Sequence, residues 1–213
     1  MKNIIISKYN TLYESWGDIK GEDIREHLPT LRKYASKCES ILELGVRGCI
    51  SSWAFAYGLL ENGSDTKKLI MNDVTSCEVS DILNVCCDLD VGIDIKYKWI
   101  SDLELDVTNI NVDLVFIDTW HVYPQLKKEL EIYSKVANKY IIMHDTEVDG
   151  KVGEAVRQRQ NIIEQSNQSG FSEEDICCGL QRAIDEFLLE NKNWVIHEHF
   201  VNNNGLTILR REG

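Results

Sequence analysis

The sequence predicts an α/β fold, namely a doubly wound, mostly parallel seven-stranded sheet with a C-terminal antiparallel hairpin. Short apolar runs alternate with segments of helical spacing, which is typical of parallel strands joined by crossover helices. The run at 112–118 is apolar almost without interruption, as in a strand that is covered on both faces. Near the C-terminus, two short runs are joined by an Asn- and Gly-rich turn, which indicates a β-hairpin.

The individual elements follow from the spacing of apolar residues. Ile24, Leu28 and Leu31 lie at helical spacing and are expected to line one face of an opening helix. The expected strands are residues 41–45, 68–73, 94–100, 112–118, 139–145, 194–200 and 206–211. The expected helices are residues 51–61, 78–89, 124–137 and 180–191, and Pro124 lies in the first turn of its helix.

A long polar segment, residues 147–179, interrupts this alternation. It is rich in Glu, Gln, Asn, Ser and Gly and shows little periodicity. Segments of this kind beside a site often act as lids or substrate loops. We therefore expect a single domain over residues 1–213, with 147–179 as a lid or substrate loop. The stretch "VRQRQ" at 156–160 is interpreted as a solvated helix face.

Composition restricts the classes of partner. The chain has 213 residues and is 43% hydrophobic, which is enough for one compact core. A net charge of −12 disfavours nucleic acid as a partner. The apolar runs are too short to cross a bilayer, and no secretory signal is recognised, so we expect a cytoplasmic protein without membrane association. Seven cysteines without a CxxC motif are expected to be reduced thiols.

The turn after the first strand has the features of a ligand-binding loop. Gly45 and Gly48 would let a ligand approach the backbone, and the helix that begins near Ser51 would offer free N–H groups. The third glycine of the dinucleotide fingerprint is missing, and Glu43 would repel a pyrophosphate. These features disfavour a nucleotide-dependent oxidoreductase and suit a ligand with a positive centre and an amino group.

Two further acids follow the second and third strands. Asp73 could accept hydrogen bonds from both hydroxyls of a ribose, and Asp102 could accept a hydrogen bond from the amino group of an adenine. A single acid of this kind is more often a solvated loop residue or a helix cap. Together with Glu43, however, these acids would suit an adenosine joined to a sulfonium amino acid.

A second group of polar residues follows two strands that we expect to be neighbours. Asp118 and Asp145 would converge there, and carboxylates with room for water suit Mg²⁺ or another hard divalent ion. The alternative is that Asp118 caps the next helix and Asp145 caps a turn. His121 lies three residues after Asp118, and a neutral imidazole near pH 7 can accept the proton of a substrate hydroxyl.

Three stretches carry a family resemblance that covers about residues 24–210. The stretch "ILELGVRGCISSWAFAYGL" resembles motif I of class I S-adenosylmethionine (SAM)-dependent methyltransferases. Two further stretches resemble one branch of this family, which contains macrolide-sugar O-methyltransferases and cephalosporin-hydroxylase-like proteins. They are "FIDTWHVYPQLKKELEIY" and "KYIIMHDT". This resemblance implies a Rossmann-like methyltransferase fold, SAM as cofactor, and His121 as general base.

The resemblance also implies a metal centre. In the sugar methyltransferases the metal is held by an Asp at the position of Asp118 and by two consecutive acids, which here are His144 and Asp145. Mg²⁺ or Mn²⁺ is expected. The histidine departs from the pattern and could shift the preference toward Mn²⁺, Fe²⁺ or Zn²⁺, or leave His144 outside the ligand set.

These observations lead to one main hypothesis. The chain is expected to be a SAM-dependent, metal-assisted O-methyltransferase that acts on a hydroxyl of a small polar acceptor, such as a sugar or a glycosylated metabolite. The alternative is a SAM-binding protein of the same fold without turnover. The oligomeric state stays open, with a homo-oligomer as one option.

Overall fold

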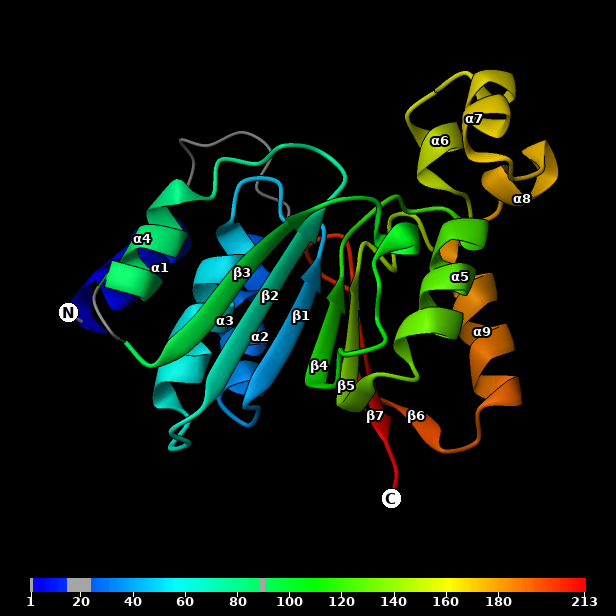
Figure 1. Ribbon diagram of the computed structural model, residues 1–213. Helices are drawn as coiled ribbons and strands as arrows, with labels where there is room; N and C mark the ends of the chain where they lie inside the picture. The colour runs from blue at the N-terminus through cyan, green and yellow to red at the C-terminus, as the bar shows by residue number, and fades with distance from the viewer. Residues whose placement is uncertain (1, 15–23, 89–90) are drawn as a thin grey trace. The chain divides into compact units, whose positions relative to one another are not determined.

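The computed structural model describes residues 2–14, 24–88 and 91–213 (Figure 1). Its seven strands form a sheet with the order β3-β2-β1-β4-β5-β7-β6. The strands are β1 (Ser40–Leu44), β2 (Lys67–Asp73), β3 (Ile93–Trp99), β4 (Val112–Ile117), β5 (Ala137–His144), β6 (Trp194–Phe200) and β7 (Leu206–Arg211). The predicted fold class is therefore confirmed.

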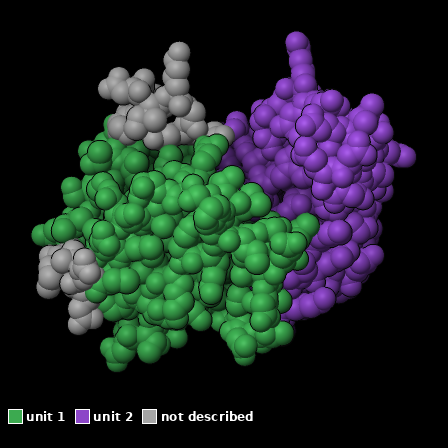
Figure 2. Space-filling view, turned by 45° about the horizontal axis from the view of Figure 1, so that its top comes forward, with its two compact units in different colours: residues 1–117 green, residues 118–213 purple. Residues whose placement is uncertain are grey.

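The chain divides into two compact units, residues 1–117 and 118–213 (Figure 2). The division falls between Ile117, which ends β4, and Asp118. Each unit has its own helices and its own buried side chains. Among the described residues, no helix is long and apolar enough to span a membrane.

Unit 1 contains the first half of the sheet. In it, β1 pairs in parallel with β2 and β4, and β2 pairs in parallel with β3. Its α-helices are α1 (Lys2–Glu14), α2 (Leu28–Ala35), α3 (Ile50–Glu61) and α4 (Ser80–Asp88), and two 3₁₀ turns are η1 (Arg25–His27) and η2 (Asp102–Glu104). The helix expected from residue 78 begins two residues later, and Leu89, its expected end, lies outside the described residues.

The helices of unit 1 pack closely on one another. Ile24, Leu28 and Leu31 are all buried as expected, but Ile24 precedes η1 and only Leu28 and Leu31 belong to the helix α2. Burial of each such side chain contributes roughly 1.5–3 kcal/mol. Gly58 allows α3 to approach α2, because a Cβ atom at this position would overlap the side chain of Ala35. A glycine in the middle of a helix is otherwise unfavourable, so its presence here is explained by the close approach.

Unit 2 contains the mixed part of the sheet. In it, β7 pairs antiparallel with both β5 and β6. Its helices are α5 (Tyr123–Tyr133), α6 (Glu154–Arg157), α7 (Ile162–Ser169), α8 (Glu173–Cys177) and α9 (Leu180–Glu190), and α5 packs against α9. The expected helix end at residue 137 is wrong. The helix stops at Tyr133, and Ala137 already belongs to β5, because a turn at Ser134 separates the two elements.

The polar segment 147–179 contains three short helices, α6, α7 and α8 (Figure 1, yellow). These helices have a small core of Val122, Ala155 and Ile176, against which Trp120, Ile162 and Phe171 pack. The helices have four, eight and five residues, which is too short to produce a readable helical period in the sequence. Their role as a lid remains a prediction.

Candidate active site

Glu43, the acid predicted inside the first strand, is enclosed by its own chain. Its side chain is fully buried, and its two carboxylate oxygens accept hydrogen bonds from Ser51 Oγ (2.5 Å) and Ser52 Oγ (2.7 Å). Both serines lie in the first turn of α3. Glu43 therefore fixes the start of α3 to β1.

The glycine-containing loop between β1 and α3 has an unusual backbone. Gly45 has φ of 85°, and Arg47 and Cys49 also have positive φ values of 42° and 59°. Left-handed conformations are costly for residues with a side chain and occur often at functional sites. The N–H of Gly45 donates to Asn72 O (2.9 Å), which holds the turn against the end of β2. A Cβ atom on Gly48 would meet only Ile50, so this glycine is not required by packing.

Asp73, at the end of β2, accepts four hydrogen bonds. Its Oδ2 accepts the N–H groups of Val46 and Arg47 (both 2.9 Å), and its Oδ1 accepts the N–H and hydroxyl of Thr75 (both 2.8 Å). Burial favours a higher pKa for this carboxyl, but the hydrogen bonds outweigh burial and lower the pKa. Asp102 is buried in η2, so the three predicted cofactor acids all lie in unit 1.

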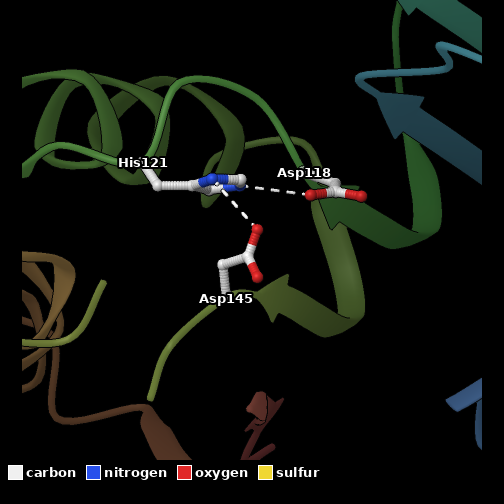
Figure 3. A group of neighbouring side chains, drawn as sticks. All are labelled: Asp118, His121 and Asp145. Carbon is white, nitrogen blue, oxygen red and sulfur yellow. Dashed lines mark hydrogen bonds and ion pairs between the residues drawn. The ribbon is translucent and has the colours of Figure 1, made fainter. Parts of the chain in front are cut away.

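Unit 2 brings Asp118, His121 and Asp145 together (Figure 3). The Nε2 atom of His121 lies 3.1 Å from Asp118 Oδ1, and its Nδ1 atom lies 3.1 Å from Asp145 Oδ2. One ligand atom from each of the three residues lies within 4.8 Å of the other two. Two carboxylates and an imidazole in this arrangement could hold a divalent ion.

The turn after β5 presents Asp145 in a strained conformation. The strand ends at His144, and Asp145 follows with φ of 57°, in the left-handed region that residues other than glycine rarely adopt. This turn directs the carboxylate toward His121 (Figure 3). Strain of this kind is maintained only where the surrounding structure holds the residue in place.

His144 also borders this cluster. Its Nε2 atom lies 3.1 Å from the carbonyl oxygen of Asn203, and a carbonyl can only accept, so Nε2 carries the hydrogen. Its Nδ1 atom lies 3.4 Å from Asp118 Oδ1 and 3.6 Å from Asp145 Oδ1. A ligating histidine commonly has one nitrogen bonded to a carbonyl and the other facing the metal.

Three further residues of the site were missed in the sequence. Glu154 Oε2 and Asp149 Oδ2 lie 3.4 Å and 3.7 Å from His121 Nδ1. Arg157 donates two hydrogen bonds to the fully buried carboxylate of Asp149, at 2.5 and 2.7 Å. All three lie in the polar segment, where no periodicity singled them out. Arg157 is 39% exposed, so it lies on a solvated helix face as predicted for "VRQRQ", but its guanidinium also pairs with Asp149.

The carboxylates determine the protonation of the ring. Burial favours a lower pKa for His121, but its contacts with Asp118 and Glu154 outweigh burial and raise the pKa well above its usual range. Burial favours a higher pKa for Asp118, but hydrogen bonds with His121 and His144 hold that pKa well below its usual range. In the metal-free protein, His121 is thus an imidazolium among carboxylates.

No protein-family model and no curated protein matches this sequence. Solved structures do match. The O-methyltransferase TomG from Streptomyces achromogenes, in complex with SAM, has a TM-score of 0.59 at 14% identity, over 98% of this chain and 90% of that chain. The methyltransferase PaMTH1 from Podospora anserina, bound to S-adenosylhomocysteine (SAH), has a TM-score of 0.58 at 12% identity, over 98% of this chain and 88% of that chain. An O-methyltransferase from Bacillus cereus, in complex with SAH, has a TM-score of 0.55 at 14% identity, over 99% and 90%. The chain therefore has the fold of SAM-dependent O-methyltransferases.

Proposed function

We propose that the protein is a SAM-dependent, divalent-metal-assisted O-methyltransferase that acts on a hydroxyl of a small polar acceptor. The observation that carries this proposal is the cluster of Asp118, His121 and Asp145 in a chain with the methyltransferase fold. The cluster combines two oxygen donors for a cation with an imidazole that can accept a proton. O-methylation needs both functions, because the acceptor hydroxyl must lose its proton as it attacks the methyl group.

Unit 1 would bind SAM, which supplies the methyl group. The left-handed turn at Gly45 and the start of α3 offer main-chain groups to the amino acid part, and the buried Asp102 is suited to an adenine amino group. Asp73 fits a ribose less simply, because four donors already occupy its carboxylate. Ribose binding at this residue would require Thr75 to exchange its hydrogen bonds for those of the ribose.

Unit 2 would bind the metal and the acceptor. Asp118 and Asp145 supply the carboxylates, and His144 Nδ1 is placed to be a third donor. When bound, Mg²⁺ or Mn²⁺ would polarise the acceptor hydroxyl and lower its pKa. His121 would then accept the proton, since a cation held by the same carboxylates lowers the pKa of the imidazole.

The acceptor class rests on the chemistry of residues 147–179. This segment contributes Glu154, Asp149 and Arg157 to the surroundings of His121, and it is predominantly polar. Polar side chains favour an acceptor with several hydroxyl groups, such as a sugar. The alternative, a protein that binds SAM without turnover, retains the same cofactor residues and differs only in lacking metal-dependent activity.

Calorimetric titration of S-adenosylhomocysteine into metal-stripped protein, followed by titration of Mn²⁺, tests the proposal. We expect both ligands to bind, and we expect Asp118→Asn to lose the Mn²⁺ heat while it keeps the nucleoside heat. Absence of nucleoside binding in the wild-type protein would overturn the methyltransferase proposal. Binding of both ligands without methylation of any sugar in a panel would favour the alternative.

A further inference from the structure

The turn that begins with the candidate metal ligand Asp145 is hydrogen-bonded to the β6–β7 hairpin. We refer to residues 145–148 as the metal loop. The N–H groups of Glu147 and Val148 both donate to Asn204 O, at 2.9 and 3.0 Å. Gly205 makes this approach feasible, because a Cβ atom there would overlap the backbone of Glu147. With φ of 96°, Gly205 also adopts a conformation that disfavours other residues.

A chain of side chains joins the same two segments. Glu147 Oε1 lies 2.7 Å from His199 Nε2, and His199 Nδ1 lies 2.9 Å from Thr207 Oγ1. The Thr207 hydroxyl in turn donates to Thr146 Oγ1 at 2.9 Å. Thr146 and Thr207 are buried, whereas Glu147 and His199 are 45% and 34% exposed. We refer to Thr146, Glu147, His199 and Thr207 as the brace.

The brace lies next to His144, which ends β5, and Asp145, which follows it. Thr146 and Glu147 directly follow Asp145, whose positive φ needs support from its neighbours. The carbonyl of Asn203, in the hairpin turn, fixes the ring of His144. Residues of the hairpin therefore contact the chain on each side of Asp145.

We propose that His199 and Thr207 are positioning residues that hold the metal loop in its ligating conformation. This inference rests on the proposed metal site. Supporting hydrogen bonds around a metal commonly change its affinity 10- to 100-fold. Loss of the Thr207 hydroxyl removes the partner of Thr146 Oγ1 and of His199 Nδ1. The strained turn at Asp145 would then relax and hold the cation less tightly.

The test is Mn²⁺ affinity of the metal-stripped protein, measured by calorimetry and by the electron paramagnetic resonance signal of free Mn²⁺. We expect Thr207→Val, which keeps the shape of the side chain, to weaken Mn²⁺ binding about tenfold. Thr207→Ser restores the hydroxyl and should restore the affinity. His199→Gln should weaken binding to a similar extent. His197→Gln on the same strand, whose ring lies beside Tyr140, is the matched control and should bind as wild type does.

The outcomes separate this inference from the proposal on which it rests. A wild-type protein that binds no Mn²⁺ overturns the metal site itself. A wild-type protein that binds Mn²⁺, with Thr207→Val and His199→Gln binding equally well, overturns only the positioning role. If substitution at residue 207 impairs folding in general, Thr207→Ser should also bind Mn²⁺ weakly. The His199→Gln variant, at a partly exposed position, then tests the positioning role: unchanged Mn²⁺ affinity in this variant would overturn it.

Discussion

The predicted site acids of the two units have different hydrogen-bond and ion-pair partners. In unit 1, neutral donors of the chain itself surround Glu43 and Asp73, namely serine and threonine hydroxyls and backbone N–H groups. In unit 2, Asp118 and Asp145 face the two nitrogens of one imidazole ring. The first arrangement needs no added charge, whereas the second is stable only with a cation between the carboxylates.

This difference assigns the two groups of acids to different tasks. A buried carboxylate that is fully hydrogen-bonded by neutral groups stabilises one backbone conformation, whether or not a ligand is bound. Carboxylates that face one another repel unless a proton or a metal lies among them. We therefore expect substitutions of Glu43 and Asp73 to act mainly on stability, and substitutions of Asp118 and Asp145 to act mainly on cation binding.

Removal of Arg157 should have the largest effect on stability, because it would leave the buried carboxylate of Asp149 without its guanidinium partner. Its guanidinium pairs with Asp149, whose side chain is 0% exposed. Breaking a buried pair by removal of one partner costs about 3–5 kcal/mol, and the partial exposure of Arg157 places the expected loss at about 3 kcal/mol. Urea denaturation of Arg157→Met in the absence of metal measures it.

Arg159→Met is the matched control for that experiment. Arg159 lies in the same "VRQRQ" stretch, but its side chain is exposed, so we expect a change within about 0.5 kcal/mol. Equal effects of the two substitutions would show that the pair with Asp149 does not stabilise unit 2.

Glu43→Ala should destabilise unit 1 by about 2 kcal/mol, because two buried serine hydroxyls would lose their acceptor. Glu43→Gln should cost less, since its amide oxygen can still accept one of the two bonds. The midpoint of thermal unfolding measures both variants. An unchanged midpoint in Glu43→Ala, together with lost SAH binding, would instead indicate that Glu43 contacts the cofactor.

The sequence predicted the sheet well, because strands of a parallel sheet are short apolar runs separated by helices. The run at 112–118 corresponds to β4, and the Asn/Gly turn near residue 204 corresponds to the β6–β7 connection. Prediction failed for α6 and α8, because helices of four or five residues are too short to show a helical period in the sequence. Glu154 and Arg157 lie in α6 and were missed for that reason.

The candidate site could be predicted only in part. Asp118 and Asp145 were predicted because each follows an apolar run at its end, and His121 because it lies three residues after Asp118. The bonds that enclose Glu43 and Asp73 could not be read from the sequence. They depend on where α3 begins and on the left-handed turn at Gly45, and both are set by tertiary packing.

Competition between protons and metal should sharpen the comparison in unit 2. The pKa of His121 lies well above its usual range, so the ring is protonated at neutral pH in the metal-free protein. Mn²⁺ can bind tightly only when His121 loses this proton. The affinity for Mn²⁺ should therefore weaken about tenfold, or about 1.4 kcal/mol, for each pH unit below the pKa of His121. Calorimetry in buffers of different ionisation enthalpy should detect about one proton released per Mn²⁺ bound. Binding without proton release would show that His121 is neutral before the metal arrives.

The smallest expected effect concerns Asp73 and the acid side of the stability curve. Because its pKa is lowered in the folded state, Asp73 stabilises the protein above its unfolded pKa of about 4, and this contribution is lost as the pH falls through the folded pKa. Asp73→Asn cannot accept all four hydrogen bonds and should cost about 1 kcal/mol at pH 7. The difference in unfolding free energy between wild type and Asp73→Asn should shrink steadily as the pH falls from about 5 through the lowered pKa of folded Asp73. Asp65→Asn, which removes the charge of an exposed aspartate in the same unit, controls for net charge. A difference that stays constant as the pH falls would mean that the hydrogen bonds to Asp73 do not depend on its charge. The acids of the two units would then differ less in how they are stabilised than their geometry indicates.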